Sequence, residues 1–79
     1  MEVYLLSEEN DQIIIHNADD LGRVLKRTRK DSGFSQSKLA KDAGVTIRSI
    51  THWENGTRKM SLYSAEKVFR ALKKKLVIG

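Results

Sequence analysis

Between residues 18 and 72, apolar side chains recur at intervals of three and four residues, with charged residues between them. This spacing places the apolar residues on one face of a helix, so the pattern predicts amphipathic helices packed around one small core. Breaks in the pattern divide the segment into helices at about residues 18–31, 36–43, 47–55 and 62–72.

Local signals indicate where these helices begin and end. An oxygen-bearing side chain before a helix accepts from the free N–H groups of its first turn, and a glycine after it takes the left-handed conformation that stops it. Ala40 is small and lies four residues before Gly44, so the second and third helices can cross closely, as a helix-turn-helix requires. The expected N-caps are Asn17, Ser35, Thr46 and Ser61, and the terminating glycines are Gly33, Gly44 and Gly56.

The ends of the chain predict β-structure instead. Residues 2–6 and 12–16 are short apolar runs on either side of a polar cluster, which predicts a hairpin. Residues 76–78 predict a short strand that pairs either with this hairpin or with its counterpart in a second subunit. The expected fold is mainly α, with a β-hairpin at 1–17, a helix-turn-helix domain at 18–72 and a C-terminal dimerisation strand at 73–79.

Charge is divided unevenly along the chain. Residues 1–20 carry six acidic and no basic residues (−6), whereas residues 21–79 carry all 15 lysines and arginines against four acids (+11). Such a separation of acidic from basic residues is typical of a protein that binds a polyanion, although a solvated basic surface has the same composition. Because no membrane-spanning run or secretory signal is evident, we expect a cytoplasmic, nucleoid-associated protein with no membrane partner.

One stretch holds many residues in fixed register, namely Gly33-Phe34-Ser35-Gln36, Leu39-Ala40, Ala43-Gly44-Val45-Thr46, Ile50 and Trp53-Glu54-Asn55-Gly56. This stretch resembles the Cro and C1 repressor family of helix-turn-helix proteins, also called lambda-repressor-like or XRE proteins. The helices before and after it also fit, so the resemblance covers about residues 18–72. It implies a lambda-repressor-like domain whose 47–55 helix enters the DNA major groove.

The resemblance implies that the outer side of the 47–55 helix reads bases. Arginine suits guanine because its planar fork matches the O6 and N7 acceptors together, whereas isoleucine can only touch a thymine methyl. Many family members have a polar residue, often glutamine, in place of Ile47, so no operator sequence transfers from the family. An exposed histidine such as His52 is also often uninvolved. The expected base-contacting residues are Ile47, Arg48, Ser49, Thr51 and His52.

The resemblance also implies phosphate contacts around this helix and an ion pair behind it. In the family, an arginine four residues before the first glycine pairs with the glutamate of the Trp-Glu-Asn-Gly motif, here Arg29 with Glu54. Such a pair keeps one guanidinium edge for a phosphate. The alternative is two exposed charges that never meet. The expected phosphate-contacting residues are Gln36, Arg29, Asn55, Arg58 and Lys59.

Together these features predict a sequence-specific regulator of transcription, which we expect to be a repressor. Two copies of the 47–55 helix in a homodimer are expected to enter successive major grooves, about 34 Å apart, on an inverted repeat of double-stranded DNA. The C-terminal strand also resembles the antitoxins of the HipB type. This implies an alternative, an antitoxin that binds a toxin protein and autoregulates its operon.

Other functional classes have less support in the sequence. There is no nucleophile elbow, phosphate-cradling glycine loop or cysteine, and the two histidines are far apart, so we expect no enzyme, no cofactor and no metal site. A protein-only adaptor built on the same helices is the rival class. The pair Arg48-Ser49, with Asn55 and Arg58, favours DNA binding, because exposed base- and phosphate-contacting side chains have little purpose in an adaptor.

Overall fold

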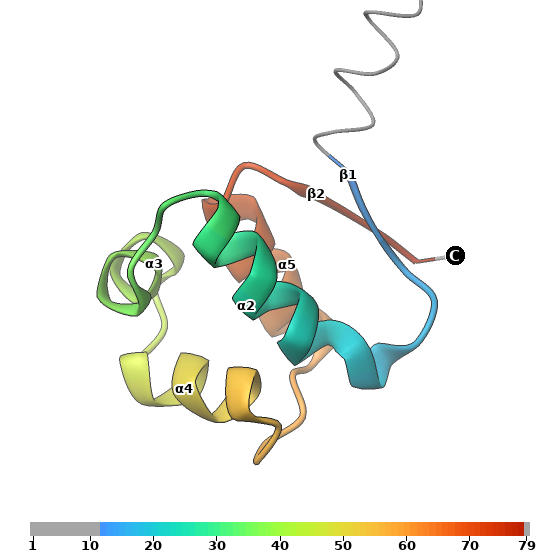
Figure 1. The fold of residues 1–79 in the computed structure, drawn as a ribbon, viewed down its shortest axis with the longest axis horizontal. Helices are drawn as coiled ribbons and strands as arrows, with labels where there is room; N and C mark the ends of the chain where they lie inside the picture. The colour runs from blue at the N-terminus through green and yellow to red at the C-terminus, as the bar shows by residue number, and fades with distance from the viewer. Residues whose placement is uncertain (1–11, 79) are drawn as a thin grey trace, which may run out of the picture.

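The computed structural model describes residues 12–78 of the chain. Within them, four α-helices form the body and two short strands lie together on one side of it (Figure 1). The mainly α, four-helix fold predicted from the sequence is confirmed. In chain order the elements are β1 (Gln12–Ile15), the 3-10 turn η1 (Ala18–Asp20), α2 (Leu21–Asp31), α3 (Gln36–Ala43), α4 (Ile47–Asn55), α5 (Leu62–Ala71) and β2 (Lys75–Ile78).

The helices α3, α4 and α5 begin at the hydroxyl residues that the sequence predicts as their N-caps. Ser35, Thr46 and Ser61 are extended, and each side chain accepts a hydrogen bond from the backbone N–H three residues further on. Asn17 instead caps η1 by accepting from the N–H of Asp19. The first predicted helix therefore opens with a 3-10 turn before α2, a common arrangement at helix N-termini.

The core lies between the four helices, which contact each other in a ring. α2 packs against α4, α4 against α3, α3 against α5, and α5 back against α2. Burial of their apolar faces drives folding, because each Å² of apolar surface removed from water contributes about 25 cal/mol. The largest fully buried side chains are Phe69, Leu21, Leu25, Leu39, Ile50 and Val68.

A glycine permits the close crossing of α2 and α4. A Cβ atom built on Gly22 would lie 1.9 Å from the carbonyl oxygen of Trp53 and 2.9 Å from its carbonyl carbon. The obstructing atoms belong to the backbone, so they cannot rotate away as a side chain would. Glycine is therefore needed here for close backbone approach, and it sets how near α4 lies to α2.

β1 and β2 form a parallel two-stranded sheet, in which Gln12 is opposite Lys75 and Ile15 is opposite Ile78. Parallel strands need a long connection, and here the helical body supplies it. The C-terminal strand thus pairs with the N-terminal strand of its own chain, one of the two partners that the sequence allowed. The other arm of the predicted hairpin, residues 2–6, lies outside the described residues.

The sheet packs one face on the helices and turns the other to solvent. Ile15 is 3% exposed, and Ile13 and Leu76 pack against the core, whereas Ile14 is 56% exposed. This alternation follows from the two-residue period of a strand, which sends neighbouring side chains to opposite faces. The strands thereby extend the core beyond the four helices.

Candidate nucleic-acid interface

α4 is the second helix of the helix-turn-helix, and the turn before it fixes its direction. Gly44 closes this turn in the left-handed conformation (φ 72°), and the N–H of Val45 donates to the carbonyl of Ala40 over 3.0 Å. On the inner side of α4, Ile50 is fully buried and Trp53 is 8% exposed. α4 is thus anchored through one face, and its other face is left for a ligand.

A buried ion pair joins α4 to α2. Nε of Arg29 donates to Oε2 of Glu54 over 2.7 Å, and Nη2 donates to Oε1 over 3.0 Å, with side-chain exposures of 10% and 1%. The hydrogen bond to Glu54 raises the pKa of the Arg29 guanidinium above its ordinary value. Such a two-bond, charge-assisted contact fixes both side chains and holds the C-terminal end of α4 against α2.

This geometry leaves little of Arg29 for DNA, although the sequence suggested a free guanidinium edge. Nη1 donates to the carbonyl of Phe34 over 2.8 Å, so all three guanidinium nitrogens already donate within the protein. The residue as a whole is 8% exposed. Three of its five N–H groups are therefore engaged with the protein, which fits a role in positioning α4, while the phosphate contact by Arg29 stays a prediction. Local sequence patterns do not reveal this third bond, because the turn after α2 brings the Phe34 carbonyl to Nη1.

Gln36 and Thr51 extend this network to the outer side of α4. The amide nitrogen of Gln36 donates to Oε1 of Glu54 over 3.0 Å, and its amide oxygen accepts from the hydroxyl of Thr51 over 3.2 Å. The same hydroxyl lies 3.0 Å from the carbonyl oxygen of Ile47. Gln36 therefore bridges the start of α3 to α4, a role that sequence reasoning missed because its partners lie 15 and 18 residues away.

The predicted base-contacting residues fall into two groups on α4. Arg48 is exposed and makes no hydrogen bond or ion pair within residues 12–78, and Ile47 beside it is 48% exposed. Ser49 is half-buried and accepts from the N-cap hydroxyl over 2.9 Å, and Nδ1 of His52 lies 2.8 Å from the hydroxyl of Thr57. Arg48 and Ile47 can therefore reach outward, while the other side chains, Thr51 included, are engaged with the protein.

The loop after α4 brings together the remaining predicted phosphate contacts. Asn55, Arg58 and Lys59 are all exposed. Nζ of Lys59 lies 3.4 Å from Oδ1 of Asp19, but the side chains are 90% and 65% exposed, so water screens this pair strongly. A groove of about 460 Å³ separates the loop from η1 and the start of α2, and its lining includes Asp19, Gly22, Arg23, Asn55, Arg58 and Lys59.

Arg23 is a cation of this groove that sequence reasoning did not place there. It lies on the first turn of α2, and its Nη2 is 2.7 Å from Oδ1 of Asp20. Its place in the same groove as Arg58 depends on the α2–α4 crossing, which no local pattern reveals. One signal could have drawn attention to Arg23. It is a cation in the first turn of a helix that packs on the recognition helix.

Within residues 12–78, no group of three or more histidine, aspartate or glutamate side chains is placed to hold a metal ion. None of the helices described is long and apolar enough to cross a membrane.

The class of protein follows from the fold and this surface together with a family match. Residues 25–78 match the family model described as helix-turn-helix, and the match includes all of α3, α4 and α5. The chain belongs to this family, with the Cro/C1-type motif that the sequence predicted. It is by class a DNA-binding regulator.

Two curated relatives are both antitoxins named HipB. One, from Escherichia coli O6:H1 (strain CFT073), is 31% identical over 58 residues, which are 73% of this chain and 62% of the relative. The other, from Escherichia coli strain K12, is 29% identical over 58 residues, which are 73% of this chain and 66% of the relative. The chain is thus similar to a little under two thirds of each antitoxin.

Proposed function

We propose that this protein is a sequence-specific transcriptional repressor that reads an inverted repeat in double-stranded DNA through α4. The observation that carries the proposal is the way in which α4 is held. Its inner face is buried and its C-terminal end is fixed by the Arg29–Glu54 pair, while Arg48 is exposed and makes no hydrogen bond within the described residues. A rigid helix with a free arginine is what major-groove recognition needs.

In this proposal some side chains around α4 contact bases and others contact phosphates. Arg48 reads a guanine and Ile47 contacts a thymine methyl, with Ser49, Thr51 and His52 near the bases or backbone. Phosphate contacts come from Gln36, Asn55, Arg58 and Lys59. The phosphate contacts fix the protein on the duplex and make the affinity fall with salt, while the base contacts carry sequence preference.

We further propose that the protein acts as a homodimer, because one α4 reads too few bases for a regulator. The 18–72 unit is the DNA-binding domain, and the strand region at 73–79 contributes to dimerisation. The exposed face of the sheet, with Ile14 at 56% exposure, supports this assignment. Two copies then place their α4 helices about 34 Å apart, on half-sites one helical turn apart.

A binding selection on random duplexes tests base reading, with Arg48→Ala as the variant and Arg27→Ala as a charge-matched control on the exposed side of α2. We expect the parent protein and Arg27→Ala to enrich the same inverted repeat. Arg48→Ala should lose preference at one position of each half-site, at a cost of about 1–3 kcal/mol. If Arg48→Ala enriched the same sequence as the parent, α4 would not read bases through Arg48.

The second candidate function is that of an antitoxin, which the similarity to the two HipB antitoxins favours. In this role the protein binds a toxin protein and also represses its own operon. Co-expression with the product of the adjoining gene tests it. Growth arrest by that product alone, relieved by this protein together with a stable complex of the two, would support the antitoxin role. A harmless neighbour that does not bind would contradict it.

A further inference from the structure

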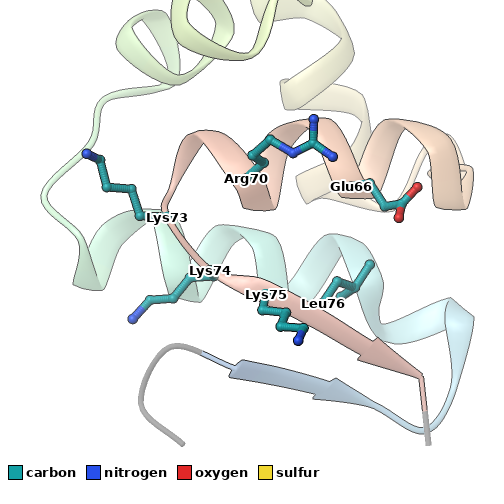
Figure 2. A pocket seen from close by; sticks show the side chains of 6 residues that line it. All are labelled: Glu66, Arg70, Lys73, Lys74, Lys75 and Leu76. Carbon is teal, nitrogen blue, oxygen red and sulfur yellow. The ribbon is translucent and has the colours of Figure 1, made fainter. Parts of the chain in front are cut away.

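Positive charge alone does not show which side chains of this protein read bases. Cations also surround a groove of about 440 Å³ between the end of α5 and β2, where Figure 2 shows Arg70 projecting from α5 and Lys75 lying on β2. In Figure 1 the two strands and α4 lie on opposite sides of α2 and α5. Base reading needs hydrogen-bonding atoms that are held in a fixed direction, so the hydrogen bonds on the surface of α4 identify a reader better than its charge does.

His52 lies on the same outer side of α4 as Arg48. The two residues are four positions apart, which is about one helical turn, or about 5.4 Å along the axis. The buried residues Ile50, Trp53 and Glu54 lie on the other side of the helix. Within the part of the chain that the structure describes, the half-buried imidazole makes its hydrogen bond through Nδ1. Nε2 is therefore the ring nitrogen that is left for a ligand.

The turn after α4 holds Thr57 beside this ring. Gly56 takes the left-handed conformation (φ 78°), and the N–H of Thr57 donates to the carbonyl of His52 over 3.0 Å. The N–H of Gly56 donates to the carbonyl of Trp53 over 3.3 Å. These two bonds form a Schellman helix ending, which commonly brings two apolar side chains together at the positions of Thr57 and His52. Here a hydroxyl and an imidazole meet instead, with Nδ1 and the hydroxyl oxygen 2.8 Å apart.

The direction of this hydrogen bond decides what Nε2 can do. The Thr57 hydroxyl has a single proton, and its oxygen lies 2.8 Å from Nδ1 and 3.2 Å from the carbonyl oxygen of His52. That carbonyl already accepts from the N–H groups of Gly56 and Thr57, so the proton belongs on the shorter contact, to Nδ1. A neutral imidazole that accepts at one nitrogen carries its own proton on the other. Nε2 is then a hydrogen-bond donor, while Nδ1 is kept against the protein.

We propose that His52 reads a purine through Nε2–H, and that Thr57 is the positioning residue that fixes the imidazole for this contact. The acceptor is N7, which both purines present in the major groove. The inference rests on the proposed function, because it requires α4 to lie in that groove. A single donor does not distinguish adenine from guanine, so this position should accept either purine, whereas the fork of Arg48 selects guanine. One helical turn spans roughly one to two base pairs of about 3.4 Å each, so the two positions should be neighbours.

A binding selection with His52→Ala, Thr57→Val and Thr57→Ser tests the pair. Thr57→Val keeps the shape of the side chain and removes the hydroxyl, whereas Thr57→Ser keeps the hydroxyl. We expect His52→Ala and Thr57→Val to lose the purine preference at the same position, and Thr57→Ser to keep it. The charge control is Arg70→Gln, which removes a cation from the α5–β2 groove and should leave the preference at every position unchanged.

A duplex with a 7-deazapurine at that position removes N7 and keeps the base pair. The affinity of the parent protein should fall about two- to tenfold, the effect of one lost hydrogen bond, and that of His52→Ala should not change. No loss in the parent, an equal loss in His52→Ala, or a parent-like preference in Thr57→Val would overturn the proposal.

The position of the ring proton can be measured without DNA. Nitrogen NMR of the His52 imidazole, at a pH where the ring is neutral, should show the proton on Nε2. A proton on Nδ1 would overturn the proposal, because Nε2 would then be an acceptor. If the parent enriched no sequence, the proposed function and this inference would both fail. A guanine position that depends on Arg48, with no purine position beside it, would overturn this inference alone.

Discussion

The buried Arg29–Glu54 pair gives the most direct prediction about how α4 is held. Glu54→Ala removes the two carboxylate oxygens that accept from Arg29, at 2.7 and 3.0 Å, and with them the acceptor of the Gln36 amide, also at 3.0 Å. The arginine left behind is 8% exposed, so water cannot replace the lost partner well. Removing one partner of a buried ion pair costs about 3–5 kcal/mol. A domain of this size has a total stability of roughly 4–12 kcal/mol, so the variant should lose a large part of its stability and, at the low end of that range, should be close to unfolding.

Urea unfolding followed by circular dichroism measures this loss, with Asp42→Ala as the control. Asp42 pairs with Lys38 over 3.1 Å, but the side chains are 37% and 58% exposed, so this substitution should cost only about 0.3–0.5 kcal/mol. Arg29→Met/Glu54→Leu should recover much of the stability lost in Glu54→Ala, because no charge is then buried alone. If Glu54→Ala cost no more than Asp42→Ala, the ion pair would not hold α4 and the reasoning would be refuted.

Three further predictions follow from particular positions. Gly22→Ala should force α2 and α4 apart and lower the stability by about 1–3 kcal/mol in thermal unfolding; a parent-like midpoint would mean that the 1.9 Å approach is relieved at no cost. Lys73→Gly should raise the stability by about 0.5–1 kcal/mol, because it removes a Cβ from a left-handed position (φ 61°); a lower midpoint would show that no strain is stored there. Arg58→Ala should weaken binding to all duplexes alike and reduce the salt slope by about 1, as titrations at several salt concentrations would show; a loss confined to one sequence would instead make Arg58 a base reader.

Local features of the fold could be predicted from the sequence, and non-local ones could not. Ser35, Thr46 and Ser61 cap their helices as expected, because capping depends on residues three positions away. The pairing of β1 with β2 joins segments more than 60 residues apart, and the sequence left their partners open. The family resemblance directed attention to Arg29 and Glu54, but only the packed structure shows that all three guanidinium nitrogens already donate within the protein.

In the candidate site, too, local features could be predicted from the sequence and non-local ones could not. The exposure of Arg48 follows from helical spacing once Ile50 and Trp53 are assigned to the inner face. In contrast, the bonds from Gln36 to Glu54 and Thr51 depend on the crossing of α3 with α4, which no periodicity specifies. Which side chains of a recognition helix are free and which are already engaged is therefore a question that only the tertiary structure answers.

The central claim is that α4, fixed from behind, enters the major groove of a DNA duplex. Amide NMR during titration with a random-sequence duplex at low ionic strength tests this claim most directly. We predict a complex in which the largest signal changes fall on Ile47–Asn55 and the loop that follows. The absence of any complex, or changes confined to α5 and β2, would contradict it.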